Sequence, residues 1–258
     1  MTQSLLELND LTMRFGGLIA VQGLTLSVQP GEIVGLIGPN GAGKTTVFNC
    51  ISRFYTPQAG TIRFDGRDIT RAAPHDVIRH GISRTFQNVE LCRSMTVLEN
   101  LLVGQHARLS GGVLRDGLRL PSVKRQADAA RAWADEVLNS LQLLPYRDRM
   151  AATLPFGIQK MVELARAVVS RPRLVLLDEP AAGADTHETA ELSEVIRHIH
   201  ERFDLSVLLV EHDMSLVMGL CHRLYVLDFG KLIAEGSPTD IQRHPAVLEA
   251  YLGEVTTM

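Results

Sequence analysis

A glycine-rich segment, Gly38–Thr46, has the residue types and spacing of a phosphate-binding loop. Glycines let successive backbone N–H groups turn toward an anion, and the N-terminus of a following helix adds positive potential. Lys44 can reach the β- and γ-phosphates of a nucleoside triphosphate, and the Thr45 hydroxyl can bind Mg²⁺. The segment fits G-x-x-x-x-G-K-[ST] without a gap, and we predict that it binds phosphate through Gly38, Pro39, Asn40, Gly41, Ala42, Gly43, Lys44, Thr45 and Thr46.

The residues on both sides of this segment support the prediction. The apolar run 32–37 predicts a short strand, and residues 47–51 continue as a helix. A strand, a glycine turn and a helix start are the context that a phosphate-binding loop requires. The alternative is a glycine-rich turn with a chance match to the pattern.

An acidic pair, Asp178 and Glu179, follows the apolar run Leu174–Leu177. This pattern places the two carboxylates at the C-terminal end of a buried strand, where ligands bind in open α/β sheets. We expect Asp178 to hold Mg²⁺, and Glu179 to accept a proton from the attacking water or to orient it. The alternative is an acidic strand end that only caps the next helix.

Composition limits the class of protein. The chain has 258 residues, of which 45% are hydrophobic, and a net charge of −3, so no global basic field indicates nucleic acid. Its three cysteines are scattered without CxxC pairing, which is typical of a reducing compartment. The first residues lack the pattern of a signal peptide, and no long apolar run predicts a membrane span. Other subunits would have to hold the chain at a membrane.

The order of the predicted elements indicates an α/β protein with a helical insertion. Residues 5–37 and 60–66 are predicted to form β structure. After residue 165, apolar strands alternate with a helix over His187–Phe203, a hairpin near Phe229, and a short helical end from Thr239 to Gly253. Fully apolar strands alternating with helices imply a mainly parallel sheet covered on both faces.

The middle of the chain is predicted to be helical. One apolar stripe recurs at steps of three and four residues, as on one face of a helix. The stripe consists of Ala127, Ala130, Ala134, Val137, Leu141 and Leu144. We therefore predict one domain over 1–258, with an α/β core formed by 1–87 and 166–258 and a helical subdomain over 88–165.

The segment Leu154–Gln159 narrows the class. It precedes a helix over Met161–Ala167 and lies shortly before Asp178. Here the chain resembles the ATP-binding-cassette (ABC) ATPases, whose signature segment has this position and is typically L-S-G-G-Q. The resemblance implies that the segment contacts the ATP of a partner subunit through Leu154, Pro155, Phe156, Gly157, Ile158 and Gln159.

The signature segment departs from the common form. Pro155 stands where serine is usual, so a hydroxyl contact to the γ-phosphate is lost, and Phe156 and Ile158 replace the usual glycine and glutamine. Gly157 remains. The Pro–aromatic–Gly version is similar to a variant of one branch of the family. An inactive half-site is the alternative, because hydrogen-bond donors are what a phosphate clamp uses.

The same resemblance implies roles for four single residues. Gln87 matches the glutamine loop and would bind Mg²⁺ or the attacking water. His212 matches the switch histidine that contacts the γ-phosphate, and Phe15 matches the aromatic that stacks on adenine. Asp185 matches the loop that crosses between paired subunits. Without the family context, Gln87 would be taken as a surface residue, Phe15 as a core residue and His212 as structural.

Finer features are similar to the LivG-type ATPases of branched-chain (hydrophobic) amino-acid importers. They are residues 84–88, 95–100, 179–183 and 250–253, and the long helical insert. The resemblance implies an ABC-type P-loop core with an N-terminal antiparallel β subdomain, and ATP and Mg²⁺ as cofactors. It also implies a second homologous ATPase or a homodimer, two membrane permease subunits, an extracytoplasmic solute-binding protein and no nucleic acid. The location would be peripheral, on the cytoplasmic face of the inner membrane.

Other functions remain open from the sequence. Related importers carry amides, urea or aromatic acids, and a cytosolic assembly ATPase of the iron–sulfur cluster type belongs to the same superfamily. Nucleic-acid or ribosome-associated ATPases usually carry two cassettes or a coiled-coil insertion, and this chain has neither. Lipid export is disfavoured by the length of the helical insert.

Overall fold

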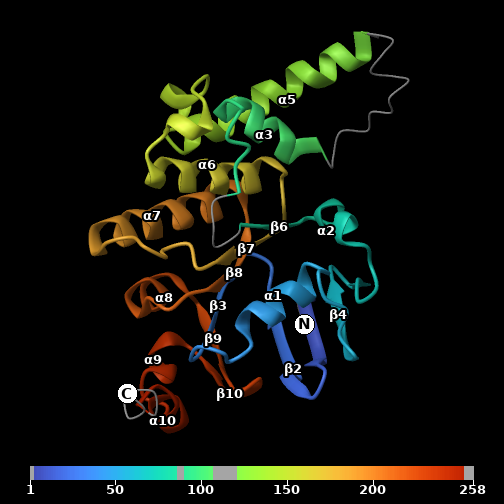
Figure 1. Cartoon of the computed structure of the whole chain (residues 1–258), viewed down its shortest axis with the longest axis vertical. Coiled ribbons are helices and arrows are strands. Elements are labelled where there is room, and N and C mark those ends of the chain that lie inside the picture. The colour runs from blue at the N-terminus through green and yellow to red at the C-terminus, as the bar shows by residue number, and fades with distance from the viewer. Residues whose placement is uncertain (1–2, 86–89, 107–120, 253–258) are drawn as a thin grey trace. The chain divides into compact units, whose positions relative to one another are not determined.

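A computed structural model describes residues 3–85, 90–106 and 121–252. The chain divides into two compact units, one formed by residues 1–84 and 173–258 and the other by residues 85–172. Figure 1 shows both units, with helices and strands labelled where there is room. Each unit is described by itself below.

A six-stranded sheet forms the centre of the first unit, in the order β10-β9-β3-β8-β7-β6. Five of its strands are parallel neighbours, and only β10 pairs antiparallel, with β9. The strands are β3 (Ile33–Ile37), β6 (Ile82–Arg84), β7 (Leu174–Asp178), β8 (Ser206–Val210), β9 (Arg223–Asp228) and β10 (Lys231–Gly236). Every residue of β3, β7 and β8 is buried. The prediction of a mainly parallel sheet from apolar runs is therefore confirmed.

A second, antiparallel sheet is built mostly from the N-terminal residues, in the order β2-β1-β4-β5. Its strands are β1 (Leu6–Phe15), β2 (Leu18–Val28), β4 (Ala59–Phe64) and β5 (Arg67–Asp68). The β structure predicted within residues 5–37 is confirmed by β1 and β2, and Leu24, Leu26 and Val28 are buried on one face of β2. The predicted N-terminal antiparallel β subdomain is present.

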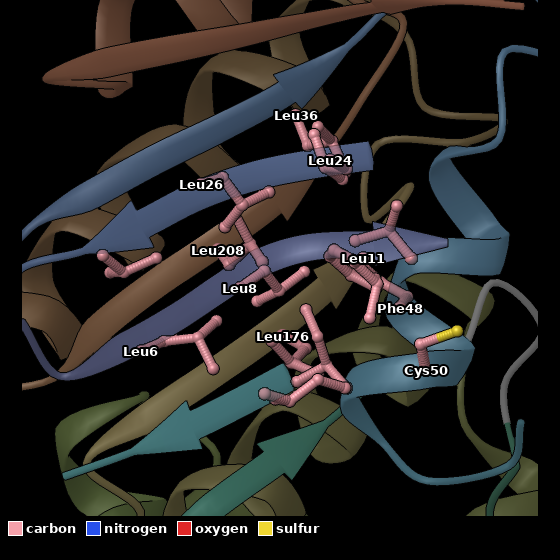
Figure 2. Packing of buried hydrophobic residues seen from close by; sticks show 14 of the residues in the cluster. Leu6, Leu8, Leu11, Leu24, Leu26, Leu36, Phe48, Cys50, Leu176 and Leu208 are labelled. Atoms are coloured by element: carbon pink, nitrogen blue, oxygen red, sulfur yellow. The ribbon is translucent and has the colours of Figure 1, made fainter. Parts of the chain in front are cut away.

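The core of the first unit lies between these two sheets (Figure 2). Leucines of β1 and β2 point toward Leu176 of β7 and Leu208 of β8, with Phe48 of α1 (Lys44–Ile51) beside them. On the other face of β3, Gly35 leaves room for Cys221 and Val217, which follow or belong to α8 (Met214–Leu220). Both faces of the central sheet are thus covered, as a parallel sheet requires.

The remaining helices of the first unit are α2 (Pro74–His80), α7 (Thr186–Phe203), α9 (Pro238–Ile241) and α10 (Pro245–Leu252). Of these, α7 agrees with the helix predicted over His187–Phe203, whereas α2 was not predicted. The prediction of a single C-terminal helix from Thr239 to Gly253 is wrong, because the helix is interrupted between α9 and α10. Pro245 starts a new helix there, since proline lacks the N–H that a continuing helix needs.

The second unit is helical, with α3 (Val97–Gln105), α5 (Pro121–Ser140) and α6 (Phe156–Val169). Ala130, Ala134 and Val137 of the predicted stripe are buried, but Leu144 is exposed. Leu144 was wrongly placed because α5 ends at Ser140 and Leu144 begins a 3₁₀ turn, where the helical period no longer applies. Trp133 ties α5 to α6 by donating its indole N–H to the Val169 carbonyl at 2.9 Å. Among the residues described, no helix is long and apolar enough to cross a bilayer.

The guanidinium of Arg223 joins the two sheets of the first unit. It donates to both carboxylate oxygens of Glu32 at 2.8 and 2.9 Å, and to the Ser27 carbonyl of β2 at 3.0 Å. It also donates to Tyr225 Oη at 2.9 Å and to Glu235 at 2.8 Å. These contacts use the planar fork of donors that arginine has and lysine lacks.

We therefore predict that Arg223→Lys lowers the free energy of unfolding by about 2 kcal/mol, because several partly buried acceptors lose their donors. Urea denaturation at neutral pH measures the change. The control is Arg197→Lys, because Arg197 forms an exposed pair with Glu194 within one helix. That control is expected to cost less than about 0.5 kcal/mol. Equal losses for the two variants would contradict the joining role of Arg223.

Candidate functional site

The segment Gly38–Thr46 forms a turn between β3 and α1, and its glycines hold conformations that other residues avoid. Gly38, Gly41 and Gly43 have φ of +145°, +78° and +102°. A Cβ on Gly38 would collide with the Leu227 carbonyl oxygen, and one on Gly43 with the carbonyl oxygen of Ala20. The loop is therefore packed against the backbones of β9 and β2, and only glycine fits at these two positions.

Lys44 is the first residue of α1 and its side chain is buried in the loop. Its Nζ donates to the carbonyls of Gly38 at 2.6 Å and Pro39 at 2.8 Å. Gly43, the N-cap of α1, has no side chain to cover the first amides of the helix, and Thr45 is exposed. An ammonium group and a helix N-terminus thus meet in one glycine-rich loop, which is the arrangement that binds phosphate.

Strand register brings the other predicted groups to the same edge of the sheet. β8 lies between β3 and β7, and Val210 of β8 is paired with both Leu36 and Asp178. The phosphate-binding loop, the acidic pair and His212 therefore all lie at the carboxyl ends of three adjacent parallel strands. This edge is where ligands bind in open α/β sheets.

Glu179 and His212 are in direct contact. His212 Nε2 lies 2.9 Å from Glu179 Oε1, and both side chains reach solvent in part. Glu179 has φ of +48°, an unfavourable conformation for a residue with a Cβ, and its amide donates to the Val210 carbonyl at 2.8 Å. A carboxylate and an imidazole held this way can together orient a water molecule.

Asp178 is buried and paired with an arginine that the sequence did not single out for a role. Arg84 Nη2 lies 2.6 Å from Asp178 Oδ2, and the two side chains are only 9% and 7% exposed. Arg84 ends β6, donates to Asn49 Oδ1 at 2.8 Å and lies over the Phe48 ring. The signal available in the sequence was a charged residue ending a strand, just before the predicted glutamine loop.

Two further predicted residues lie in the first unit. Phe15 ends β1, is 41% exposed and meets the Tyr55 ring edge-on with centroids 5.1 Å apart. Asp185 is the N-cap of α7 and accepts from the amides of His187 and Glu188. The Glu188 amide, followed by that of His187, lowers the pKa of the Asp185 carboxyl below its usual range.

The signature segment lies in the second unit, and α6 begins earlier than expected. The predicted helix start at Met161 is wrong, because the helix begins at Phe156 and its first turn includes Gly157, Ile158 and Gln159. Pro155, the N-cap, offers no side-chain acceptor to the first amides. Phe156 is exposed and Leu154 is buried. Gln87 lies outside the described residues.

The buried cysteines of the first unit are unsuited to nucleophilic chemistry. Burial raises the pKa of the Cys50 thiol to about 11, against a smaller lowering effect of Arg53, and burial raises the pKa of Cys221 to about 12. Both thiols stay protonated at neutral pH, so neither is a nucleophile. The reactive groups of the site are therefore the ammonium, carboxylates and imidazole at the carboxyl ends of the strands.

Comparison with known proteins agrees with this geometry. The family model described as "ABC transporter" matches residues 21–182, and that described as "Branched-chain amino acid ATP-binding cassette transporter" matches residues 231–256. The chain belongs to the ABC transporter ATP-binding family. The predictions of an ABC-type fold and of an ABC transporter ATPase are confirmed. Membership of this family implies that ATP is the nucleotide.

Individual relatives resemble this ABC ATPase over nearly its whole length. The high-affinity branched-chain amino acid transport ATP-binding protein LivG of Escherichia coli K12 is 46% identical, and BraF of Pseudomonas aeruginosa is 44% identical. Each alignment covers 98% of this chain and 100% of the relative. Among solved structures, the ADP conformation of the cassette MJ1267 matches with a TM-score of 0.83 and 31% identity, over 98% of this chain and 100% of that one.

The buried pair of Arg84 and Asp178 gives a prediction about stability. Arg84→Met should lower the free energy of unfolding by about 3 kcal/mol, because Asp178 is left as a buried carboxylate without its cation. The double variant Arg84→Met/Asp178→Asn should lose less than Arg84→Met alone. Urea denaturation without nucleotide measures both, with Arg79→Met of the exposed Arg79–Asp76 pair as the control. A double variant less stable than Arg84→Met would contradict the account.

Proposed function

We propose that this ABC ATPase is the ATP-hydrolysing subunit of a membrane importer for branched-chain or other hydrophobic amino acids. The observation that carries the proposal is the full-length similarity to two ATP-binding proteins of branched-chain amino acid transport. The match of residues 231–256 to the branched-chain amino acid cassette family adds a feature specific to that branch.

The residues of the carboxyl edge fit the binding of ATP with Mg²⁺. The amides of the phosphate-binding loop and Lys44 would hold the β- and γ-phosphates, and the exposed face of Phe15 would stack on adenine. Thr45 and Asp178 offer the hard oxygen donors that Mg²⁺ prefers, and Gln87 would add an amide oxygen. Mg²⁺ is usually bound through one or two carboxylates together with phosphates and water, which fits a donor set whose one carboxylate is Asp178. When bound, the cation neutralises charge that develops on the phosphates.

Hydrolysis would depend on the contact between Glu179 and His212. Glu179 would orient the attacking water and accept its proton, while the imidazole of His212 would donate a hydrogen bond to the γ-phosphate. Gln87 would help to place the same water. The 2.9 Å contact supports this assignment, because it holds the two side chains together at the sheet edge where strand register also places the phosphate-binding loop.

One chain supplies only part of each ATP site in this proposal. The N-terminal turn of α6, with Leu154–Gln159, would contact the ATP held by a homologous second ATPase or a second copy, and Asp185 would lie at the same interface. ATP favours the closed pair because it binds that state better, and hydrolysis reopens it. Pro155 offers no hydroxyl to the γ-phosphate, so backbone amides at the start of α6 would carry that contact.

The pair of ATPases would work on the cytoplasmic face of the inner membrane. Two permease subunits would hold it there, and an extracytoplasmic solute-binding protein would supply the amino acid. Residues near Gln87 and the helical unit would pass the closure of the ATPase pair to a permease. The substrate itself would not touch this chain.

We predict that Glu179→Gln keeps ATP binding, lowers turnover at least about 100-fold and stabilises the closed pair, because the amide cannot accept the water proton. Turnover is measured by phosphate release, and pairing by size-exclusion chromatography with ATP. The control is Glu194→Gln, because Glu194 lies on the exposed face of α7. Equal turnover for Glu179→Gln and the wild type would refute the role of Glu179.

Uptake measurements test the proposed substrate class. Deletion of the gene for this chain in its source organism should abolish most high-affinity uptake of labelled leucine and leave uptake of urea and acetamide unchanged. The wild-type gene should restore uptake, whereas Lys44→Ala should not, because it loses the ammonium that binds phosphate. Loss of urea, amide or aromatic-acid uptake instead would point to another importer, and unchanged uptake of all of them to a cytosolic assembly ATPase.

A further inference from the structure

Glu211 is a buried carboxylate with no part in the chemistry proposed above. It follows the last residue of β8, directly precedes His212, and is 3% exposed. A carboxylate in such a place is costly unless hydrogen bonds hold its charge. Its hydrogen-bond partners therefore indicate what the residue does.

The side chain of Glu211 accepts hydrogen bonds from two different loops. Oε1 accepts from the Ala181 amide at 2.6 Å, in the loop that follows β7. Oε2 accepts from the amides of His212 at 2.8 Å and Asp213 at 3.2 Å, in the loop that follows β8. One side chain thus joins the loop of the acidic pair to the loop of the histidine.

Each of these loops carries a group proposed to act in hydrolysis. Ala181 lies two residues after Glu179, and the turn continues through hydrogen bonds from Ala182 to the Glu179 carbonyl and from Ala184 to the Ala181 carbonyl. On the other side, the Glu211 carboxylate holds the His212 amide itself. The same two loops are therefore joined twice, by the 2.9 Å contact between Glu179 and His212 and by the hydrogen bonds of Glu211.

The link requires an ionised carboxylate. Both oxygens of a carboxylate accept, so all three amides can be satisfied at once, and hydrogen bonds to a charged acceptor are short and strong. Glutamine has the same shape, but its NH₂ group would face one of the amides. Aspartate keeps the acceptors but is one methylene shorter, so it cannot span both loops as well.

We propose that Glu211 is a positioning residue that fixes the loops after β7 and β8 relative to each other, and so sets the placement of Glu179 against His212. This inference rests on the proposed ATPase mechanism. Glu211 itself touches no reacting atom. A misplacement of about 1 Å can cost about 100-fold in rate, so the link affects turnover more than nucleotide binding.

The test compares Glu211→Gln with the wild type in three measurements. Amide hydrogen exchange in the nucleotide-free chain, followed by NMR, should speed up at both Ala181 and His212 by at least about tenfold. The turnover number should fall by at least about tenfold, while the dissociation constant for ATP without Mg²⁺ stays within about twofold. In a His212→Ala background, Glu211→Gln should reduce turnover by less than about twofold further, because both variants remove the same placement.

The matched control is Glu32→Gln. Glu32 is a partly buried carboxylate directly before β3, with its side chain 15% exposed, and its Oε2 accepts from the Gln29 amide at 2.8 Å and from Arg223. This variant should lose stability, yet keep turnover within about twofold and leave amide exchange at Ala181 unchanged relative to exchange in the central sheet. Glu211→Asp is the second variant should Glu211→Gln not fold, with the same expected direction for every measurement.

Several results would overturn the proposal. Unchanged amide exchange at Ala181 or unchanged turnover in Glu211→Gln would do so. So would a double variant with His212→Ala whose fold-loss of turnover equals the product of the two single losses, or a loss of turnover in Glu32→Gln equal to that in Glu211→Gln. Wild-type protein without ATPase activity would instead refute the proposed function. The exchange measurement needs no nucleotide, so it tests the link between the two loops separately from that outcome.

Discussion

The site depends on the position of β8 in the central sheet. This strand pairs with β3 on one side and with β7 on the other, and both of its faces are buried. A strand in this position has no solvent-facing side, so after Ser206 at its amino end all of its residues are apolar. Polar groups can then appear only where the strands end. Parallel pairing places the carboxyl ends of the three strands together, which concentrates Lys44, Asp178, Glu179 and His212 at one edge.

Two arginines, one buried and one partly buried, form ion pairs at opposite ends of the strands of the central sheet. At the amino ends of the strands, Arg223 pairs with Glu32 and ties the central sheet to the N-terminal one. At the carboxyl ends, Arg84 pairs with Asp178 next to the phosphate-binding loop. The first pair stabilises the fold alone, whereas the second also holds a carboxylate that has a proposed role with Mg²⁺.

Much of this fold was predictable because local patterns determine it. Apolar runs identified β3, β7 and β8, and the glycine-rich segment identified the loop before α1. The errors occurred where a helix boundary decides the outcome, as at Leu144, at the start of α6 and at the break before Pro245. Burial patterns and propensity leave such boundaries weakly determined.

The residues that support the site were not assigned roles from the sequence, for a different physical reason. Arg84 and Glu211 act through partners 94 and 30 residues away along the chain, so no local pattern specifies them. The motif residues themselves were found because they must lie within one short segment to hold phosphate. Their supporting contacts are free to come from any strand that ends nearby.

The backbone of Glu179 has a consequence for how this chain can change over evolutionary time. Its left-handed conformation costs about 1–2 kcal/mol for a residue with a Cβ, and glycine would remove that cost. A population selected only for thermal stability would therefore tend to lose the carboxylate at position 179. With the role proposed for Glu179, glutamate at this position serves turnover at a cost in stability, so heat resistance is a poor guide to which variants of this chain still work.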